Sequence, residues 1–345
     1  MIFSEKQLHN SPPILFNNTF VSRVNEHRHL GLWLSSNLDW SKQVSEVCLK
    51  ANRKLAVLRS VRYLSRSTLD LLYKLTVRSV IDYGLVVYFH SLKVTQVARL
   101  SQLQYRAAKL CTGALNYTNQ TKLELDLGWE TIKTRADFLG LSLFQKIHLN
   151  ETRPLIKYCM PKINLARTNR NTNVYTNFVY QNKTFADSFF PYFTKKFNEL
   201  GAVTTKECDL DIFKENLKQK LKPKKFKHFS WGSKRGNTLL TQLRVCRSML
   251  NSDGFAINLA DSDLCICSRS ETVLHFVTQC FIYTEERRYL YDSLEQILPG
   301  FKSLPNKTKL DIFFNGINVN SDEIDSRNSK IISIVHKFIL KTKRL

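Results

Sequence analysis

The sequence predicts a mainly α-helical protein with a short β segment at its N-terminus and a Cys/His module near its C-terminus. Three observations predict this organisation. Short apolar runs separated by turn residues occupy residues 1–36. Apolar residues then recur every three or four positions between residues 37 and 150, which is typical of amphipathic helices. Three cysteines and a histidine gather between residues 265 and 280. At 345 residues, the chain is long enough for two or three domains.

The first 36 residues favour short strands. The predicted strands are Met1–Ser4, Ile14–Phe16, Val21–Val24 and His29–Leu34. Asn17 and Asn18 supply a hairpin turn between the second and third of these.

Residues 37–150 predict a helical bundle. Asp39 or Ser41 is available as the first N-cap. Gly113 can take the left-handed conformation that ends the third helix. Short connections between the helices favour packing as one bundle. The four expected helices are Ser41–Val61, Ser67–Val80, Val94–Cys111 and Glu130–His148.

Residues 151–235 predict a basic connector with short strands and a helix, and Pro223 marks a hinge within it. Residues 236–345 predict a helical C-terminal module. Its expected helices run over residues 237–250, from His275 to Leu298, over a short stretch ending at Gly316, and from about Asp325 onward.

The Cys/His cluster predicts a metal site. Its order is Cys265-x-Cys267-x7-His275-x4-Cys280. Three thiolates and an imidazole can surround one tetrahedral Zn²⁺, and four protein ligands leave no position for a reactive water, so the predicted role is structural. The spacing of the first pair is tighter than the usual two to four residues. The alternative is that these are ordinary buried thiols.

Charge is the main global signal. Lys and Arg number 52 against 29 Asp and Glu, a formal net charge of +23. Such a field attracts polyanions, of which nucleic acid is the commonest, although membrane-surface proteins can be equally basic. No apolar run reaches the ~18 residues of a membrane span, and the N-terminus is not a signal peptide. The other five cysteines are scattered singly, which favours the cytoplasm or nucleus over secretion.

Basic residues on the expected helices and in the connector are candidate contacts to RNA or DNA. Lysines that alternate with aromatic residues after Lys218 are typical of sequence-tolerant binding to single strands. A solvated helix face or linker is the competing interpretation. The candidates are Lys50, Arg53, Lys54, Arg99, Arg106, Lys109, Arg167, Arg170, Lys222, Lys224, Lys225, Lys227, Trp231 and Arg244.

Several segments, in this order, resemble the region C-terminal to the palm in reverse transcriptases of non-LTR retrotransposons of the jockey and LINE type. Each segment is weak alone, but the order is fairly specific. Phe197 stands where that family usually has Trp. The segments are His29–Leu32, Leu38–Trp40, Leu72–Leu75, Val80–Gly84, Leu103–Gly113, Leu127–Trp129, Ser188–Leu200, Thr241–Asn251 and Glu271–Arg288.

The resemblance implies a palm remnant (1–36), a helical thumb (37–150), the basic connector (151–235) and a zinc-binding tail (236–345). Polymerases need paired carboxylates for two Mg²⁺ ions, and this sequence has no Asp-Asp. Phe185-Ala186-Asp187 carries one acid and comes too late in the chain to replace them. No catalytic residue is therefore assigned, and Mg²⁺ is expected only in the full-length polymerase.

The chain is thus expected to act at most by binding template RNA or target DNA, with the rest of a polymerase as a further partner. The alternative is a domesticated, zinc-stabilised protein-interaction module without a nucleic-acid role.

Overall fold

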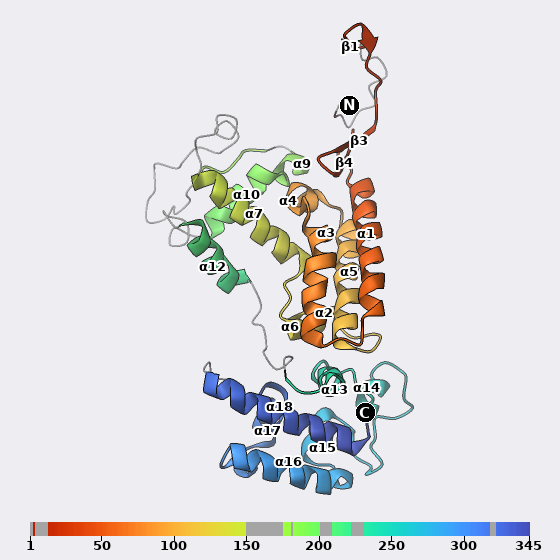
Figure 1. Cartoon of the computed structure of the whole chain (residues 1–345), viewed down its shortest axis with the longest axis vertical. Helices are drawn as coiled ribbons and strands as arrows, with labels where there is room; N and C mark the ends of the chain where they lie inside the picture. The colour runs from red at the N-terminus through yellow and green to blue at the C-terminus, as the bar shows by residue number, and fades with distance from the viewer. Residues whose placement is uncertain are drawn as a thin grey trace. The chain divides into compact units, whose positions relative to one another are not determined.

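The fold is mainly α-helical, as the sequence predicts, and Figure 1 shows the order of its elements. The computed structural model describes residues 3, 13–149, 175–180, 182–200, 209–221, 231–317 and 322–345. The chain divides into two compact units. The first comprises Met1–Ala56, Leu75–Gln104 and Glu130–Lys222, and the second comprises Val57–Lys74, Tyr105–Trp129 and Pro223–Leu345.

These units do not follow the four consecutive segments expected from the sequence. Two long helices, α1 (Ser41–Ser60) and α5 (Val94–Thr112), each contribute residues to both units. Within the described ranges, none of the helices combines the length and apolar character needed to cross a lipid bilayer.

The first unit begins with two antiparallel hairpins. β1 (Leu15–Phe16) pairs with β2 (Thr19–Phe20), and β3 (Glu26–His29) pairs with β4 (Leu32–Ser35). The turn predicted at Asn17–Asn18 is confirmed, since both residues have the positive φ (48° and 57°) that a type I′ turn requires.

Two predicted strands are wrong. Val21–Val24 forms no strand, because the two-residue turn at Asn17–Asn18 starts β2 at Thr19. The predicted strand His29–Leu34 is interrupted by a turn in which Leu30 and Gly31 have positive φ. Of the predicted strand Met1–Ser4, only Phe3 is described, and it belongs to no strand.

The other regular elements that the structure describes in the first unit are helices. α1, α5 and α7 match predicted helices to within two residues at each end. Gly113, with φ of 68°, follows α5 as expected. Besides α1 and α5, the elements are α3 (Ser79–Asp82), α4 (Leu85–Tyr88), η2 (Phe89–Ser91), α7 (Ile132–Leu149), α9 (Lys183–Ala186), α10 (Phe189–Glu199) and α12 (Leu210–Leu221).

The helix predicted at Ser67–Val80 has a different internal structure. It consists of α2 (Arg66–Leu72), a π-helical segment η1 (Tyr73–Arg78) and α3. A π turn holds an extra residue, which a 3.6-residue apolar period does not reveal. The expected connector also differs, because the residues described between 182 and 221 form the helices α9, α10 and α12.

An aromatic core joins α7, α10 and α12 in the first unit. Its fully buried members include Phe144, Phe193, Phe197 and Phe213. Gly140 on α7 permits the close approach of α10, since a Cβ built on Gly140 would lie 1.9 Å from Phe193 Cζ.

Replacing Gly140 with alanine is expected to destabilise the first unit by about 1–3 kcal/mol, the usual effect of forcing extra volume into a packed core. Chemical denaturation would measure the change. The double variant Gly140→Ala/Phe193→Leu should recover part of the loss, because the smaller side chain relieves the overlap. Additive losses in the double variant would show that the two residues do not interact.

The second unit is wholly helical among the residues described, apart from one isolated β-bridge. Its elements are α2, α6 (Gln120–Leu127), α13 (Lys234–Arg244), α14 (Asn251–Phe255), α15 (Val273–Thr278), η4 (Phe281–Tyr283), α16 (Thr284–Ile297), η5 (Phe301–Ser303), α17 (Asn306–Asn315) and α18 (Asp322–Thr342). The predicted helix over residues 237–250 is wrong at its C-terminal end. α13 stops at Arg244, and Cys246 has a positive φ of 54°.

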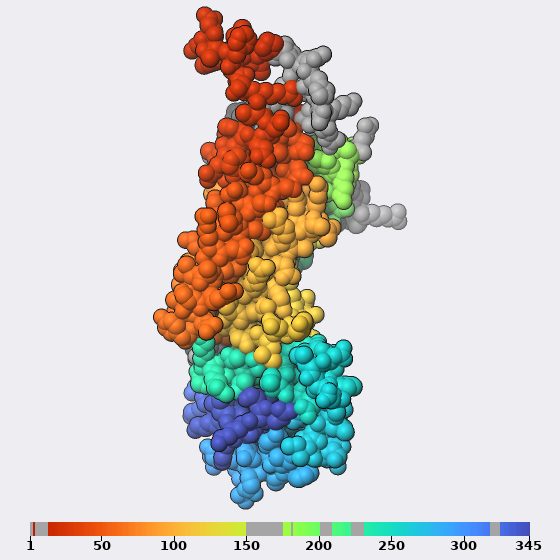
Figure 2. Space-filling model, turned by 90° about the vertical axis from the view of Figure 1, so that its right-hand side faces the viewer, coloured from red at the N-terminus to blue at the C-terminus, as the bar shows by residue number. Residues whose placement is uncertain are grey.

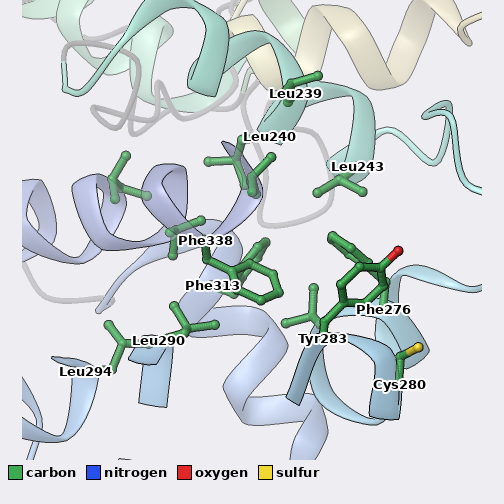
Figure 3. Packing of buried hydrophobic residues seen from close by; sticks show 14 of the residues in the cluster. Leu239, Leu240, Leu243, Phe276, Cys280, Tyr283, Leu290, Leu294, Phe313 and Phe338 are labelled. Atoms are coloured by element: carbon green, nitrogen blue, oxygen red, sulfur yellow. The ribbon is translucent and has the colours of Figure 1, made fainter. Parts of the chain in front are cut away.

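The core of the second unit lies between α13, α15, α16, α17 and α18 (Figure 3). Phe338 of α18 packs against Phe276 and Phe313, with ring centroids 5.5 and 6.0 Å apart. Cys265 and Cys280 belong to the same buried cluster, so the predicted metal ligands are continuous with this core.

A buried ion-pair cluster joins α2, α6 and α13 in the second unit. Asp126 accepts from Arg66 at 2.9 Å and from Arg244 at 2.7 Å. Arg66 also donates to the Thr241 hydroxyl at 2.7 Å. The side chains of Arg66 and Asp126 are only 3% and 2% exposed.

Candidate metal centre

The four predicted ligands come together in the second unit. The ligand atoms of Cys265, Cys267, His275 and Cys280 all lie within 4.8 Å of one another. The Cys280 sulfur lies 3.7 Å from that of Cys265 and 4.0 Å from that of Cys267, and the Cys267 sulfur lies 3.0 Å from His275 Nε2. Zinc–ligand bonds of ordinary length in a tetrahedron place ligand atoms about 3.5–3.8 Å apart. The group can therefore hold a metal ion and is compatible with zinc.

A tight loop presents the first two thiols. The Ser268 N–H donates to the Cys265 carbonyl, the Cys265 N–H donates to the Arg269 carbonyl, and both distances are 2.8 Å. Ser268 adopts a positive φ of 64°, and a β-bridge between Leu264 and Ser270 closes the loop. This reversal brings both thiols to one site despite their single-residue spacing.

The other two ligands frame a short helix. The Thr272 hydroxyl caps α15 by accepting from the His275 N–H at 3.2 Å. After α15, the Cys280 N–H donates back to the His275 carbonyl at 2.8 Å.

The helix expected to run on from His275 to Leu298 is thus two helices, which is a correction. α15 ends at Thr278 and α16 starts at Thr284. The extended backbone of Cys280 between them points its thiol back toward the loop.

Charged side chains hold the backbone of the cysteine loop and of α15 in place. Arg287 of α16 donates to the carbonyls of Val277 (3.0 Å) and Cys280. Glu271, only 2% exposed, is paired with Arg344 at 2.5 Å and accepts from the Asn251 N–H at 2.7 Å. Such outer contacts fix the orientation of ligands, because they hold the backbone that carries them.

Electrostatics distinguish the ligands. Burial raises the pKa of the Cys265 thiol to about 11. Burial also opposes ionisation of Cys267, but hydrogen bonds from the Arg269 N–H and the neighbouring cysteines outweigh it and lower its pKa. Burial and the guanidiniums of Arg269 and Arg287 lower the pKa of His275, which favours the neutral imidazole that binds metals. A metal must therefore displace a proton from Cys265 on binding.

Three of the basic residues predicted to contact nucleic acid share a face of α1 in the first unit. Lys50, Arg53 and Lys54 are exposed and form no ion pair with any residue that the structure describes. Arg99 of α5 is also exposed, and it donates to the Ser45 hydroxyl of α1 at 3.2 Å. Figure 2 shows α1 and α5 at the surface of this unit.

Two other candidates lie on the part of α5 that belongs to the second unit. Arg106 is exposed on the part of α5 that belongs to the second unit, and Lys109 lies there over the Tyr105 ring at 4.9 Å. Six other candidates lie outside the described residues: Arg167, Arg170, Lys222, Lys224, Lys225 and Lys227.

Two candidates have structural contacts in place of the expected exposure. Arg244 is 14% exposed, is paired with Asp126 and donates to the Phe314 carbonyl, so its guanidinium is held by contacts inside the second unit. Trp231 packs against the core of that unit, and its carbonyl accepts from Asn237. Sequence reasoning missed the role of Arg244 because Asp126 and Arg244 are 118 residues apart.

Comparisons with protein-family models, curated proteins and solved structures found no match.

Proposed function

We propose that this chain is a nucleic-acid-binding part of a retroelement reverse transcriptase, and that it holds a structural Zn²⁺ at Cys265, Cys267, His275 and Cys280. The order of motifs along the sequence supports the family. The donor set supports zinc, because three thiolates and an imidazole suit this ion and complete its coordination. The expected compartments are the nucleus and the cytoplasm.

The observation that carries the binding proposal is unpaired positive charge on an ordered surface. The chain has a net charge of +23, and Lys50, Arg53 and Lys54 lie on one exposed face of α1 without carboxylate partners among the described residues. Helix α1 contains one acid, Glu46, and α5 contains none. Such a surface binds the phosphate backbone of RNA or DNA and releases its counterions.

Neutralising this face is expected to weaken binding and reduce its salt dependence. The triple variant Lys50→Gln/Arg53→Gln/Lys54→Gln should lower the slope of log K against log [salt] by about 2, since each phosphate contact to a single strand contributes roughly 0.7. Fluorescence anisotropy with single-stranded RNA and DNA of matched sequence, over a series of salt concentrations, measures the slope and the preferred nucleic acid.

A matched control removes the same charge from paired lysines. Lys196, Lys214 and Lys218 in the first unit are each paired with an acid three residues away on the same helix. Their triple replacement by Gln should leave the slope nearly unchanged. If both triple variants lowered the slope equally, the effect would come from net charge and not from the α1 face. If the Lys50→Gln/Arg53→Gln/Lys54→Gln variant kept the wild-type slope, the α1 face would be excluded as a nucleic-acid contact.

The chain is not expected to polymerise by itself, because it contains no Asp-Asp pair to hold the catalytic Mg²⁺ ions. Primer extension by the purified chain with Mg²⁺ and deoxynucleotides would contradict this part of the proposal.

A further inference from the structure

The segment between α13 and α15 differs in character from the rest of this basic chain. No Lys or Arg occurs between Arg247 and Arg269, although the chain has 52 such residues. Three aspartates occur there instead: Asp253, Asp261 and Asp263. Asp253 is used internally, since its carboxylate accepts from the N–H and hydroxyl of Ser248.

The same segment exposes large apolar side chains. The most exposed is Ile266, between the first two metal-ligand cysteines, at 93%, followed by Leu259 at 72%. Met249, Phe255 and Leu264 are exposed by 59%, 51% and 48%. We call these five residues the apolar loop surface, and Figure 2 shows their segment in cyan on the second unit.

The apolar loop surface is firmly attached to the second unit. Asn251 donates to the Leu264 carbonyl at 2.5 Å, and Ser252 donates to the Glu271 carbonyl at 2.9 Å. The Glu271 N–H donates to the Asp263 carbonyl at 2.7 Å. These bonds hold α14 and its following turn against the cysteine loop, so the exposed side chains occupy an ordered scaffold.

We propose that the apolar loop surface docks a basic, apolar polypeptide segment. Exposed apolar residues on an ordered scaffold are typical of protein interfaces, whose centres are depleted of charge. Asp261 and Asp263 lie between Leu259 and Leu264 of this surface, and the residues from Ser248 to Ser268 include no Lys or Arg. These two carboxylates complement Lys and Arg on a partner and disfavour the phosphates of nucleic acid.

The docking surface differs in chemistry from the nucleic-acid face proposed on α1. The inference does not depend on nucleic-acid binding, and each function can fail alone. If both hold, the chain can bind a polyanion and a basic protein segment at separate places.

The test uses the full-length, metal-loaded chain and two fluorescent helical peptides. One peptide arranges leucine and lysine amphipathically, and the other has glutamate in place of each lysine. The chain should bind the lysine peptide in anisotropy measurements, and Ile266→Asp combined with Leu259→Ser should weaken this binding by about tenfold or more. Tyr63→Asp is the matched control, because Tyr63 is 73% exposed in the same unit but lies outside the surface.

Metal content and circular dichroism establish that the variants remain folded. Three results would overturn the proposal. The wild type and the Ile266→Asp/Leu259→Ser variant could bind the lysine peptide equally, the wild type could bind both peptides equally, or it could bind neither. Loss of RNA or DNA binding in that variant would assign the surface to nucleic acid instead. The wild type could instead bind no peptide but self-associate in sedimentation velocity, with the association abolished in this variant. The partner of the surface would then be a second copy of the chain, not a basic peptide.

Discussion

Removing the metal is expected to unfold the ligand end of the second unit and to leave the first unit folded. Structural zinc sites in small modules contribute about 10–16 kcal/mol of apparent binding free energy, and that energy is part of the folding energy. A whole domain is stable by only about 5–15 kcal/mol. Cys265 and Cys280 are members of the second unit's core, so their loss as ligands also disturbs Phe276 and its neighbours.

Hydrogen exchange measures this effect by region. After chelation, or in the His275→Ala variant, the amides of α15 and the start of α16 should lose protection, while those of α7 and α10 should keep it. Elemental analysis of the untreated protein should find one zinc per chain. Cys246→Ala is the matched control, because Cys246 is an exposed free thiol in the same unit and is not a ligand.

Two results would remove the metal proposal. One is a zinc-to-protein ratio near zero in protein prepared without chelators. The other is a His275→Ala variant with the stability of the wild type. Either would favour the alternative that the four residues are ordinary buried groups.

The long helices and the ligand cluster could be predicted because their signals are local. The apolar period of residues 94–112 fits one helix, and Gly113 supplies the residue that ends it. The four ligands lie within 16 positions, so their residue types and order were enough to identify the group.

The remaining features depend on contacts between distant residues. The sequence does not show that α13 ends at Arg244, because Ser248 and Asp253 form their hydrogen bonds only in the folded turn. The sequence predicts a surface position for Arg244, because the buried partner Asp126 is distant in the chain. The sequence also predicts one continuous helix from His275 to Leu298, because Cys280 fits the helical period even though α15 ends before it.

Replacing Asp126 with alanine is expected to destabilise the second unit by about 3–5 kcal/mol, since the change removes the buried carboxylate that both guanidiniums share. Burial lowers the pKa of Arg66 to about 10, so this residue remains charged at neutral pH. Thermal denaturation and hydrogen exchange of α2, α6 and α13 would measure the loss. Lys74→Ala is a suitable control, because its pair with Asp70 is 36% exposed on the lysine side and contributes little.

Replacing all three charged residues of the cluster tests whether the loss in Asp126→Ala comes from buried charge that no longer has its carboxylate. The triple variant Arg66→Met/Asp126→Leu/Arg244→Met removes every charge and should recover at least half of the stability lost in Asp126→Ala. A triple variant as unstable as Asp126→Ala would show that packing, not charge, accounts for the loss.

The pH dependence gives an independent measure of the same cluster. Burial alone would raise the pKa of Asp126, but Arg244 and Arg66 outweigh it and lower the pKa below its unfolded value. The contribution of Asp126 to stability is therefore complete above the unfolded pKa, about 4, and is lost as the pH falls through the folded pKa. Asp126→Asn should be less stable at neutral pH and should lose less stability on acidification than the wild type. Parallel pH profiles for the two proteins would show that the carboxylate of Asp126 does not stabilise the two arginines.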